Sequence, residues 1–160
     1  MTEVLFYHLQ RQPLERVLPE LLEKCVERHW RVVVQLGSEE RRDALDAHLW
    51  TYRDEGFLPH GTAKDGNAAL QPVWLTAGDE NPNGATVRFL ADGAEAPEFG
   101  GYDRVVLLFD GNDPDAVDRA RAQWATAKAA NHDATYWQQS DRGRWEKKAY
   151  STPGEKRVVQ

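Results

Sequence analysis

The sequence predicts an α/β fold of three layers, in which a mostly parallel, twisted, Rossmann-like sheet carries helices on both faces. Short apolar runs at residues 4–9 and 31–36 alternate with helical patterns at residues 13–28 and 39–50. This alternation is typical of right-handed β–α–β crossovers, which build parallel sheets. Residues 104–109 (RVVLLF) form the most apolar run. We therefore expect a central strand there, buried on both faces.

Two amphipathic helices are predicted in the first third of the chain. The first begins near Pro13, which suits a first turn, and its apolar stripe is Leu14, Val17, Leu18, Leu21 and Leu22. The second follows Ser38, whose hydroxyl can accept a hydrogen bond from an unpaired amide, and Glu39 and Glu40 complement the positive end of its dipole. Its buried stripe is Leu45, Leu49 and Tyr52.

Turn-rich segments separate the elements of the second half. Asp113 is predicted to cap a helix that has Pro114 in its first position and runs to about residue 130. Residues 145–150 are expected to add an edge strand, and residues 151–160 a flexible tail. We expect residues 1–150 to form a single domain. The remaining strands are predicted at residues 72–76, 85–90 (with alternating polarity) and 134–139.

Length and composition restrict the class of protein. The chain has 160 residues, of which 41% are hydrophobic and 29% charged, as is typical of a globular domain. No apolar run approaches about 18 residues, and the first residues do not resemble a signal peptide, so we expect a cytoplasmic protein with no membrane partner. The net charge of −6 argues against a general DNA-binding protein, which needs Lys and Arg over an extended face.

The sequence patterns of phosphate, metal and catalytic sites are not found. The turn at Gly37 has one glycine rather than a glycine-rich loop, and the three aspartates of residues 109–115 would repel a phosphate. The five histidines are scattered, and Cys25 has no nucleophile signature. We expect no cofactor and no metal. The alternative, a nucleotide- or metal-dependent Rossmann-like enzyme, predicts a deep polar cleft beside Gly37 or Gly111.

The end of the second helix carries apolar groups that the core does not claim. Trp50 lies about 140° around the helix from Leu45, at about 100° per residue, and so falls outside the buried stripe. Phe57 and Leu58 follow in the next loop. These groups predict a surface for a partner, and the simpler interpretation is a half-buried aromatic beside a loop.

The helix after residue 113 combines aromatic and basic residues on one face, Val117, Arg121, Trp124 and Lys128. Burial of this face would leave two cations without partners, which is costly. If the face is exposed, a tryptophan between two basic groups suits a peptide that is both acidic and apolar. The simpler interpretation buries Trp124 in a stripe with Val117, Ala120 and Ala127 and leaves Arg121 and Lys128 in solvent.

Three stretches carry a family resemblance: FYHL at residues 6–9, WRVVVQLGSEE at residues 30–40 and LDAHLWTYRDEGFLPHG at residues 45–61. The most specific feature is a tryptophan followed, after six residues, by Phe-Leu-Pro-His. From Leu5 to about Gln139 the chain resembles the chi subunit of bacterial DNA polymerase III.

The resemblance implies a catalytically inert subunit of the DNA polymerase III holoenzyme in DNA replication. Such a subunit links the clamp loader to single-stranded DNA-binding protein by holding that protein's acidic, phenylalanine-ended C-terminal tail, and it reaches DNA through its partners. In the family, one pocket for this tail is built from the tryptophan that ends the second helix, the phenylalanine of the following loop and an Arg-x-x-aromatic pair on the later helix. The arginine would pair with the carboxylates of the tail, and the aromatic residues would enclose its apolar end. These positions are Trp50, Phe57, Arg121 and Trp124 here, with Lys128 as a nearby cation.

The sequence departs from the family pattern in several places. Val117 and Ala125 stand where some members carry basic residues. The middle of the chain, residues 62–83, is longer and more polar, and the stretch DRGRWEKKAY after Gln139 has no counterpart in the pattern. The resemblance also implies a second partner, the small psi subunit of the clamp loader where an organism has one, but the motifs do not locate its surface.

Direct nucleic-acid binding is the remaining alternative. Arg142, Arg144, Lys147 and Lys148 lie close in sequence to Trp145, and this function would require them to belong to a continuous basic face. The simpler interpretation is a solvated strand edge, whose lysines discourage edge-to-edge pairing.

Overall fold

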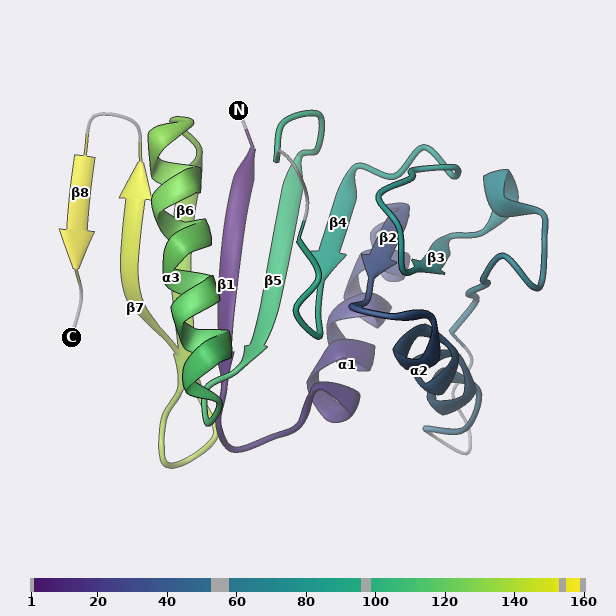
Figure 1. Cartoon of the computed structure of the whole chain (residues 1–160), viewed down its shortest axis with the longest axis horizontal. Helices are drawn as coiled ribbons and strands as arrows, with labels where there is room; N and C mark the ends of the chain where they lie inside the picture. Colours follow the sequence, from purple (N-terminus) through teal and green to yellow (C-terminus); the bar gives the residue numbers. More distant parts are fainter. Residues whose placement is uncertain (1, 53–57, 96–98, 153–154, 159–160) are drawn as a thin grey trace.

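One twisted sheet organises the chain. The computed structural model describes residues 2–52, 58–95, 99–152 and 155–158. Within them, the strands follow the spatial order β3-β2-β4-β5-β1-β6-β7-β8 (Figure 1). The first six of these are parallel, whereas β7 and β8 are antiparallel to their neighbours. The strands are β1 (Glu3–Leu9), β2 (Val32–Gln35), β3 (Val73–Thr76), β4 (Val87–Leu90), β5 (Arg104–Asp110), β6 (Asp133–Gln139), β7 (Trp145–Thr152) and β8 (Glu155–Val158).

The helices cover opposite faces of the sheet. They are α1 (Leu14–Glu27), α2 (Glu39–Thr51) and α3 (Pro114–Ala129), with a short 3₁₀ turn, η1 (Ala68–Leu70). The chain winds one way through β1, α1, β2, α2 and β3 and the other way through β5, α3 and β6 (Figure 1). Because β–α–β crossovers are right-handed, the two directions place α1 and α2 on one face and α3 on the other. The predicted three-layer α/β fold is confirmed.

Strand β5 divides the core between the two faces. Val106 and Leu108 pack with the buried leucines of α1 and α2, whereas Val105 and Leu107 pack with the buried alanines of α3. The side chains alternate because successive residues of a strand point to opposite faces. This run lies between β4 and β1, so the prediction of a central strand buried on both sides is confirmed.

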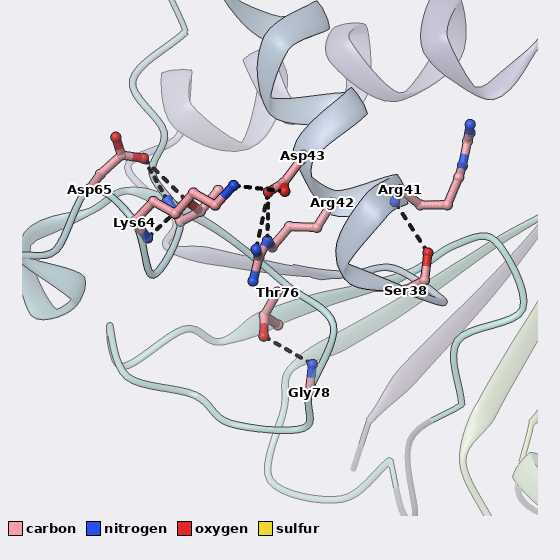
Figure 2. A network of polar contacts seen from close by, with 9 residues as sticks. Ser38, Arg41, Arg42, Asp43, Lys64, Asp65, Thr76 and Gly78 are labelled. Atoms are coloured by element: carbon pink, nitrogen blue, oxygen red, sulfur yellow. Dashed lines mark hydrogen bonds and ion pairs between the residues drawn. The ribbon is translucent and has the colours of Figure 1, made fainter.

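The helix caps form where the sequence predicts them. The Ser38 hydroxyl accepts a hydrogen bond from the Arg41 amide at 3.2 Å (Figure 2). The Asp113 carboxylate accepts one from the Asp115 amide at 3.0 Å, with Pro114 in the first position of α3. Each cap satisfies an amide that has no partner within its helix.

Strand β4 differs from its prediction. The sequence predicts alternating polarity over residues 85–90, but all four residues of β4 are buried, and Arg88 is only 1% exposed. Its guanidinium donates to Gln35 Oε1 at 2.6 Å and to the carbonyl oxygens of Gly78 and Glu80 at 2.8 and 3.0 Å. The strand lies between β2 and β5 and has no solvent face, so the polar head of Arg88 is satisfied by a loop at the rim of the sheet.

The C-terminal region also differs from its prediction. Strand β7 was expected at the edge of the sheet, but β8 pairs with it from Ala149–Val158 to Thr152–Glu155. The predicted loose tail at residues 151–160 therefore contains paired strand. Proline, glycine and charge are typical of a tail, but a Pro-Gly dipeptide is equally a turn signal, and residues 153–154 themselves lie outside the described part of the chain.

Candidate functional site

Trp50 lies at the surface, near the end of α2. Its side chain is 52% exposed, as its position off the buried stripe predicts. The ring contacts that of His60 in a tilted arrangement, with 4.7 Å between centroids and 49° between the ring planes. His60 is buried: Nε2 lies 3.1 Å from a carboxylate oxygen of Asp46, and Nδ1 lies 2.7 Å from the Leu58 carbonyl oxygen. The exposed tryptophan thus rests on a histidine that hydrogen bonds fix in place.

Residues 62–65 follow the loop that leaves α2, and charged groups lie between them and the helix. Asp43 lies 3.0 Å from Arg42 and 2.9 Å from Lys64, and Asp65 accepts a hydrogen bond from the Thr62 amide at 2.9 Å (Figure 2). The pair between Asp43 and Lys64 joins this segment to α2, whereas the other two contacts lie within the helix and within the segment.

The two apolar residues predicted beside Trp50 have different outcomes. Phe57 lies outside the described residues. Leu58 is only 2% exposed and belongs to the core with the leucines of α1 and α2. The prediction that Leu58 faces a partner is therefore wrong, because the chain turns inward between the loop and β3 and buries this side chain.

Trp124 is partly buried against the sheet. Its ring makes an edge-to-face contact with Phe6 of β1 at 5.3 Å and another with Tyr136 of β6 at 6.2 Å. Ala120 and Ala127 are fully covered by the same face of the sheet. Trp124 therefore belongs to the buried stripe of α3, as the simpler interpretation holds, and only part of its ring meets solvent.

Arg121 extends into solvent beside this ring. Its side chain is 77% exposed, and its carboxylate neighbour Asp118 lies at 4.0 Å and is similarly exposed. Burial raises the pKa of Tyr136 to about 12, and the charge of Arg121 opposes that rise. We call Arg121, Trp124 and Lys128, together with Tyr136, the α3 flank.

The α3 flank includes a residue that the sequence did not single out. Tyr136 reaches it because β6 pairs with β1 in parallel, which sets Tyr136 beside Phe6 under the helix. The Tyr136 hydroxyl also forms a hydrogen bond with His8 Nδ1. A strand residue carries no local sign of this position, since strand order decides it.

The structure does not bring Trp50 together with the α3 flank. Helices α2 and α3 cover opposite faces of the sheet, and their neighbouring strands, β3 and β6, are separated by β2, β4, β5 and β1 (Figure 1). Among the described residues, Trp50 and the α3 flank therefore lie on two separate surfaces, whereas the resemblance implies one pocket. Lys128 does lie on the same helix as Arg121 and Trp124, in its last turn.

A cleft of about 770 Å³ opens at the carboxyl ends of the parallel strands, lined in part by the residues on either side of Gly111. It lies between β1 and β5, whose following helices go to opposite faces, which is where open α/β sheets bind ligands. The nucleotide-binding alternative predicts a cleft at this place.

The charges that line the cleft do not suit a phosphate. Four carboxylates face three guanidinium groups: Glu15, Asp92, Asp110 and Asp113 against Arg11, Arg41 and Arg119. Arg41 is already bound to Glu15 and Asp92, each at 3.0 Å, and Arg11 is paired with Asp141. Of these three arginines, Arg119 alone has no ion pair with another described residue. The cleft therefore gives the nucleotide-binding alternative a cavity but not the groups that would hold the phosphates.

Cys25 and the possible metal ligands are the other candidates for chemistry in the sequence. Cys25 is buried, and desolvation raises its pKa to about 11, so its thiol stays protonated near neutral pH. Within the described ranges, no three His, Cys, Asp or Glu side chains are grouped as a metal site. No helix of those ranges is long and apolar enough to cross a membrane.

The fold places the chain among three-layer α/β proteins with mostly parallel sheets. An exposed tryptophan lies on α2, and a partly buried tryptophan with basic neighbours lies on α3. Residues 1–135 match the family described as DNA polymerase III chi subunit, HolC. The chain therefore belongs to the family of DNA polymerase III chi subunits, which are accessory subunits in DNA replication, as the motif of residues 45–61 predicts.

Two relatives are similar over part of the chain. It is 31% identical over 87 residues to the probable DNA polymerase III subunit chi of Rickettsia prowazekii (strain Madrid E), which covers 54% of this chain and 53% of the relative. It is 35% identical over 86 residues to the DNA polymerase III subunit chi of Pseudomonas aeruginosa (strain PAO1), which covers 52% and 59%. The matched stretch spans a little over half the length of these curated relatives.

Proposed function

We propose that this protein is a non-catalytic adaptor of the replicative polymerase, which captures the acidic C-terminal tail of single-stranded DNA-binding protein on the α3 flank. The observation that carries the proposal is an exposed Arg121 beside a half-buried Trp124. The adaptor needs no cofactor, acts in the cytoplasm and reaches DNA through its partners.

The α3 flank has the chemistry that such a tail requires. The pair between Arg121 and Asp118 is long and exposed, so it is worth little, and a carboxylate of the tail can replace it. A charge-assisted hydrogen bond to Arg121 would fix the acidic part of the tail. The exposed part of the Trp124 ring offers an apolar contact for its terminal phenylalanine, as aromatic anchors do in small interfaces.

The strength of the contact is expected to come from repetition. The protein carries a net charge of −6, so an acidic peptide meets general repulsion and depends on the local cations Arg121 and Lys128. A single tail should therefore bind weakly. Several tails on one oligomeric partner raise the effective concentration and so the apparent affinity.

Trp50 is proposed to serve a different partner. An adaptor must hold two proteins at once, and the two surfaces lie on opposite faces of the sheet. Trp50 is half exposed on a fixed histidine, which is typical of an interface anchor. We assign this surface to the clamp-loader side of the assembly, with the psi subunit as the partner where the organism has one.

The test is fluorescence-polarisation binding of a labelled tail peptide from the same organism's single-stranded DNA-binding protein. We expect weak binding that salt weakens further, a loss of about tenfold or more in Arg121→Ala, and a smaller loss in Lys128→Ala. Arg119→Ala is the matched control, because Arg119 is an exposed arginine on the opposite flank of α3, beside the cleft. Equal losses in Arg119→Ala and Arg121→Ala would contradict the assignment of the α3 flank.

A further inference from the structure

The hairpin of β7 and β8 lies beyond residues 1–135, which match the chi family. In Figure 1 these two strands stand to the left of α3, at one end of the sheet. The pairing of β7 with β6 extends the sheet past its helical cover. This part of the molecule therefore has a surface that family membership does not explain.

The charge of the C-terminal segment is opposite to that of the whole chain. Residues 141–160 hold six of the 20 Lys and Arg residues and three of the 26 Asp and Glu residues, which gives a net charge of +3 in a chain of net charge −6. Such an asymmetry is typical of a segment that contacts a polyanion.

Aromatic side chains lie on the α1-side face of β1, β6 and β7. Tyr7 of β1 and Trp145 of β7 meet edge to face at 5.0 Å and pack against the core beneath α1. Trp137 is the neighbour of Tyr7 on β6, so it points to the same face. The Lys147 ammonium lies 5.8 Å from the centre of the Trp137 ring. Trp137 and Trp145 are both partly exposed, so this face combines indole rings with a cation.

The turn between β6 and β7 adds two arginines. Arg142 and Arg144 are exposed, and within the described part of the chain neither side chain makes an ion pair or a hydrogen bond. Their backbone amides each donate to the Ser140 hydroxyl at 3.2 Å, which fixes the turn. The turn itself is therefore ordered, and its guanidinium groups are available to a ligand.

We propose that the surface formed by the turn between β6 and β7 and by the α1-side face of these two strands binds single-stranded DNA. Arg142, Arg144 and Lys147 would contact phosphates, and the exposed parts of Trp137 and Trp145 would stack on bases. Basic groups beside aromatic rings are the usual composition of surfaces that bind single strands, and only unpaired bases offer their faces for stacking. These residues are separate from the α3 flank, so the chain can hold the DNA and the tail of the protein that coats it at the same time.

The experiment measures the anisotropy of a fluorescein-labelled oligothymidine of about 15 nucleotides, a length within the range of single-strand site sizes. We expect saturable binding to the full chain that weakens as salt is raised. The double variant Arg142→Glu/Arg144→Glu should bind about tenfold or more weakly, with a salt slope smaller by about 1.4, since each phosphate contact to a single strand contributes about 0.7. The pair Arg142→Ala/Arg144→Ala, which removes the charge without reversing it, should show a smaller loss.

The matched control is Arg16→Glu/Arg119→Glu, which makes the same change of net charge at two exposed arginines away from this surface. A loss in the control as large as in Arg142→Glu/Arg144→Glu would overturn the proposal, as would no binding at low salt or equally tight binding of duplex DNA of the same length. Arg121→Ala should bind the oligonucleotide like the wild type. Because Arg121 is the residue on which tail binding depends, failure of one activity with retention of the other separates the two proposals.

Discussion

Trp50 and Trp124 are the same residue type on helices of the same sheet, and they differ in what surrounds them. Trp50 has half of its side chain in solvent and rests on His60. Trp124 has its ring wedged between Phe6 and Tyr136, and the solvated group beside it is Arg121. The surface at Trp50 offers an exposed apolar ring. The α3 flank offers an exposed cation, Arg121, beside a partly buried ring.

The comparison shows that residues of one family motif need not meet in one place. The pattern of α2 alone indicates that Trp50 leaves the buried stripe, whereas the pattern of α3 alone leaves the burial of Trp124 open. Whether the two outward faces adjoin is decided by the direction in which the chain leaves β2 and β5. Since those directions are opposite, the two tryptophans mark separate surfaces, and each can be changed without touching the other.

The largest effect expected around Trp50 comes from its buried neighbour. Leu58→Ala should lower the free energy of unfolding by about 3 kcal/mol, because it removes a fully buried leucine from the core. Urea denaturation followed by circular dichroism measures this change. A loss below about 1 kcal/mol would mean that Leu58 belongs to the Trp50 surface after all.

The two tryptophans should differ in their contribution to stability. Trp124→Ala is expected to cost about 2 kcal/mol, less than a fully buried ring, because part of its surface already meets water. Trp50→Ala is expected to cost less than about 1 kcal/mol. Thermal and urea unfolding of the two variants under the same conditions compares them, and equal losses would remove the distinction between a packed and an exposed tryptophan.

A smaller, pH-dependent effect sharpens the account of the α3 flank. Burial lowers the pKa of His8, Asp110 opposes this shift, and the charge of Arg121 adds to it. The folded pKa therefore lies below the unfolded value of about 6.5, so the unfolded state takes up a proton first as the pH falls. The free energy of unfolding should decrease as the pH falls below about 6.5, and the decrease should level off below the folded pKa.

The measurement for this effect is urea unfolding at about pH 7.5 and about pH 5.5, on either side of the reference pKa of histidine. His8→Gln should lose less stability than the wild type between the two pH values. Arg121→Gln should also lose less, because it removes a cation that disfavours protonated His8. If the wild type and both variants lose the same free energy of unfolding, the charge of Arg121 does not affect the protonation of His8.

Much of the fold follows from local patterns in the sequence. The positions of β1 to β7, the caps at Ser38 and Asp113, and the exposure of Trp50 and Arg121 all depend on residues close in sequence, and the structure confirms them. The burial of Arg88 does not, because it depends on β4 lying between two other strands.

The remaining differences also have non-local causes. Strand β8 pairs with the edge of β7, and the turn signal within residues 151–160 does not by itself show that this edge is open. Tyr136 joins the α3 flank because β6 pairs with β1. The distance between Trp50 and Arg121 depends on the handedness of two crossovers, so a resemblance supplies the residues but not their arrangement.

The central claim is that the tail is held on the α3 flank without Trp50. The most direct test is the affinity of the labelled tail peptide for Trp50→Ala, measured beside Arg121→Ala and the wild type. The account predicts that Trp50→Ala binds within about twofold of the wild type, while Arg121→Ala loses about tenfold or more. A loss in Trp50→Ala as large as in Arg121→Ala would contradict it and would restore a single pocket shared by both helices.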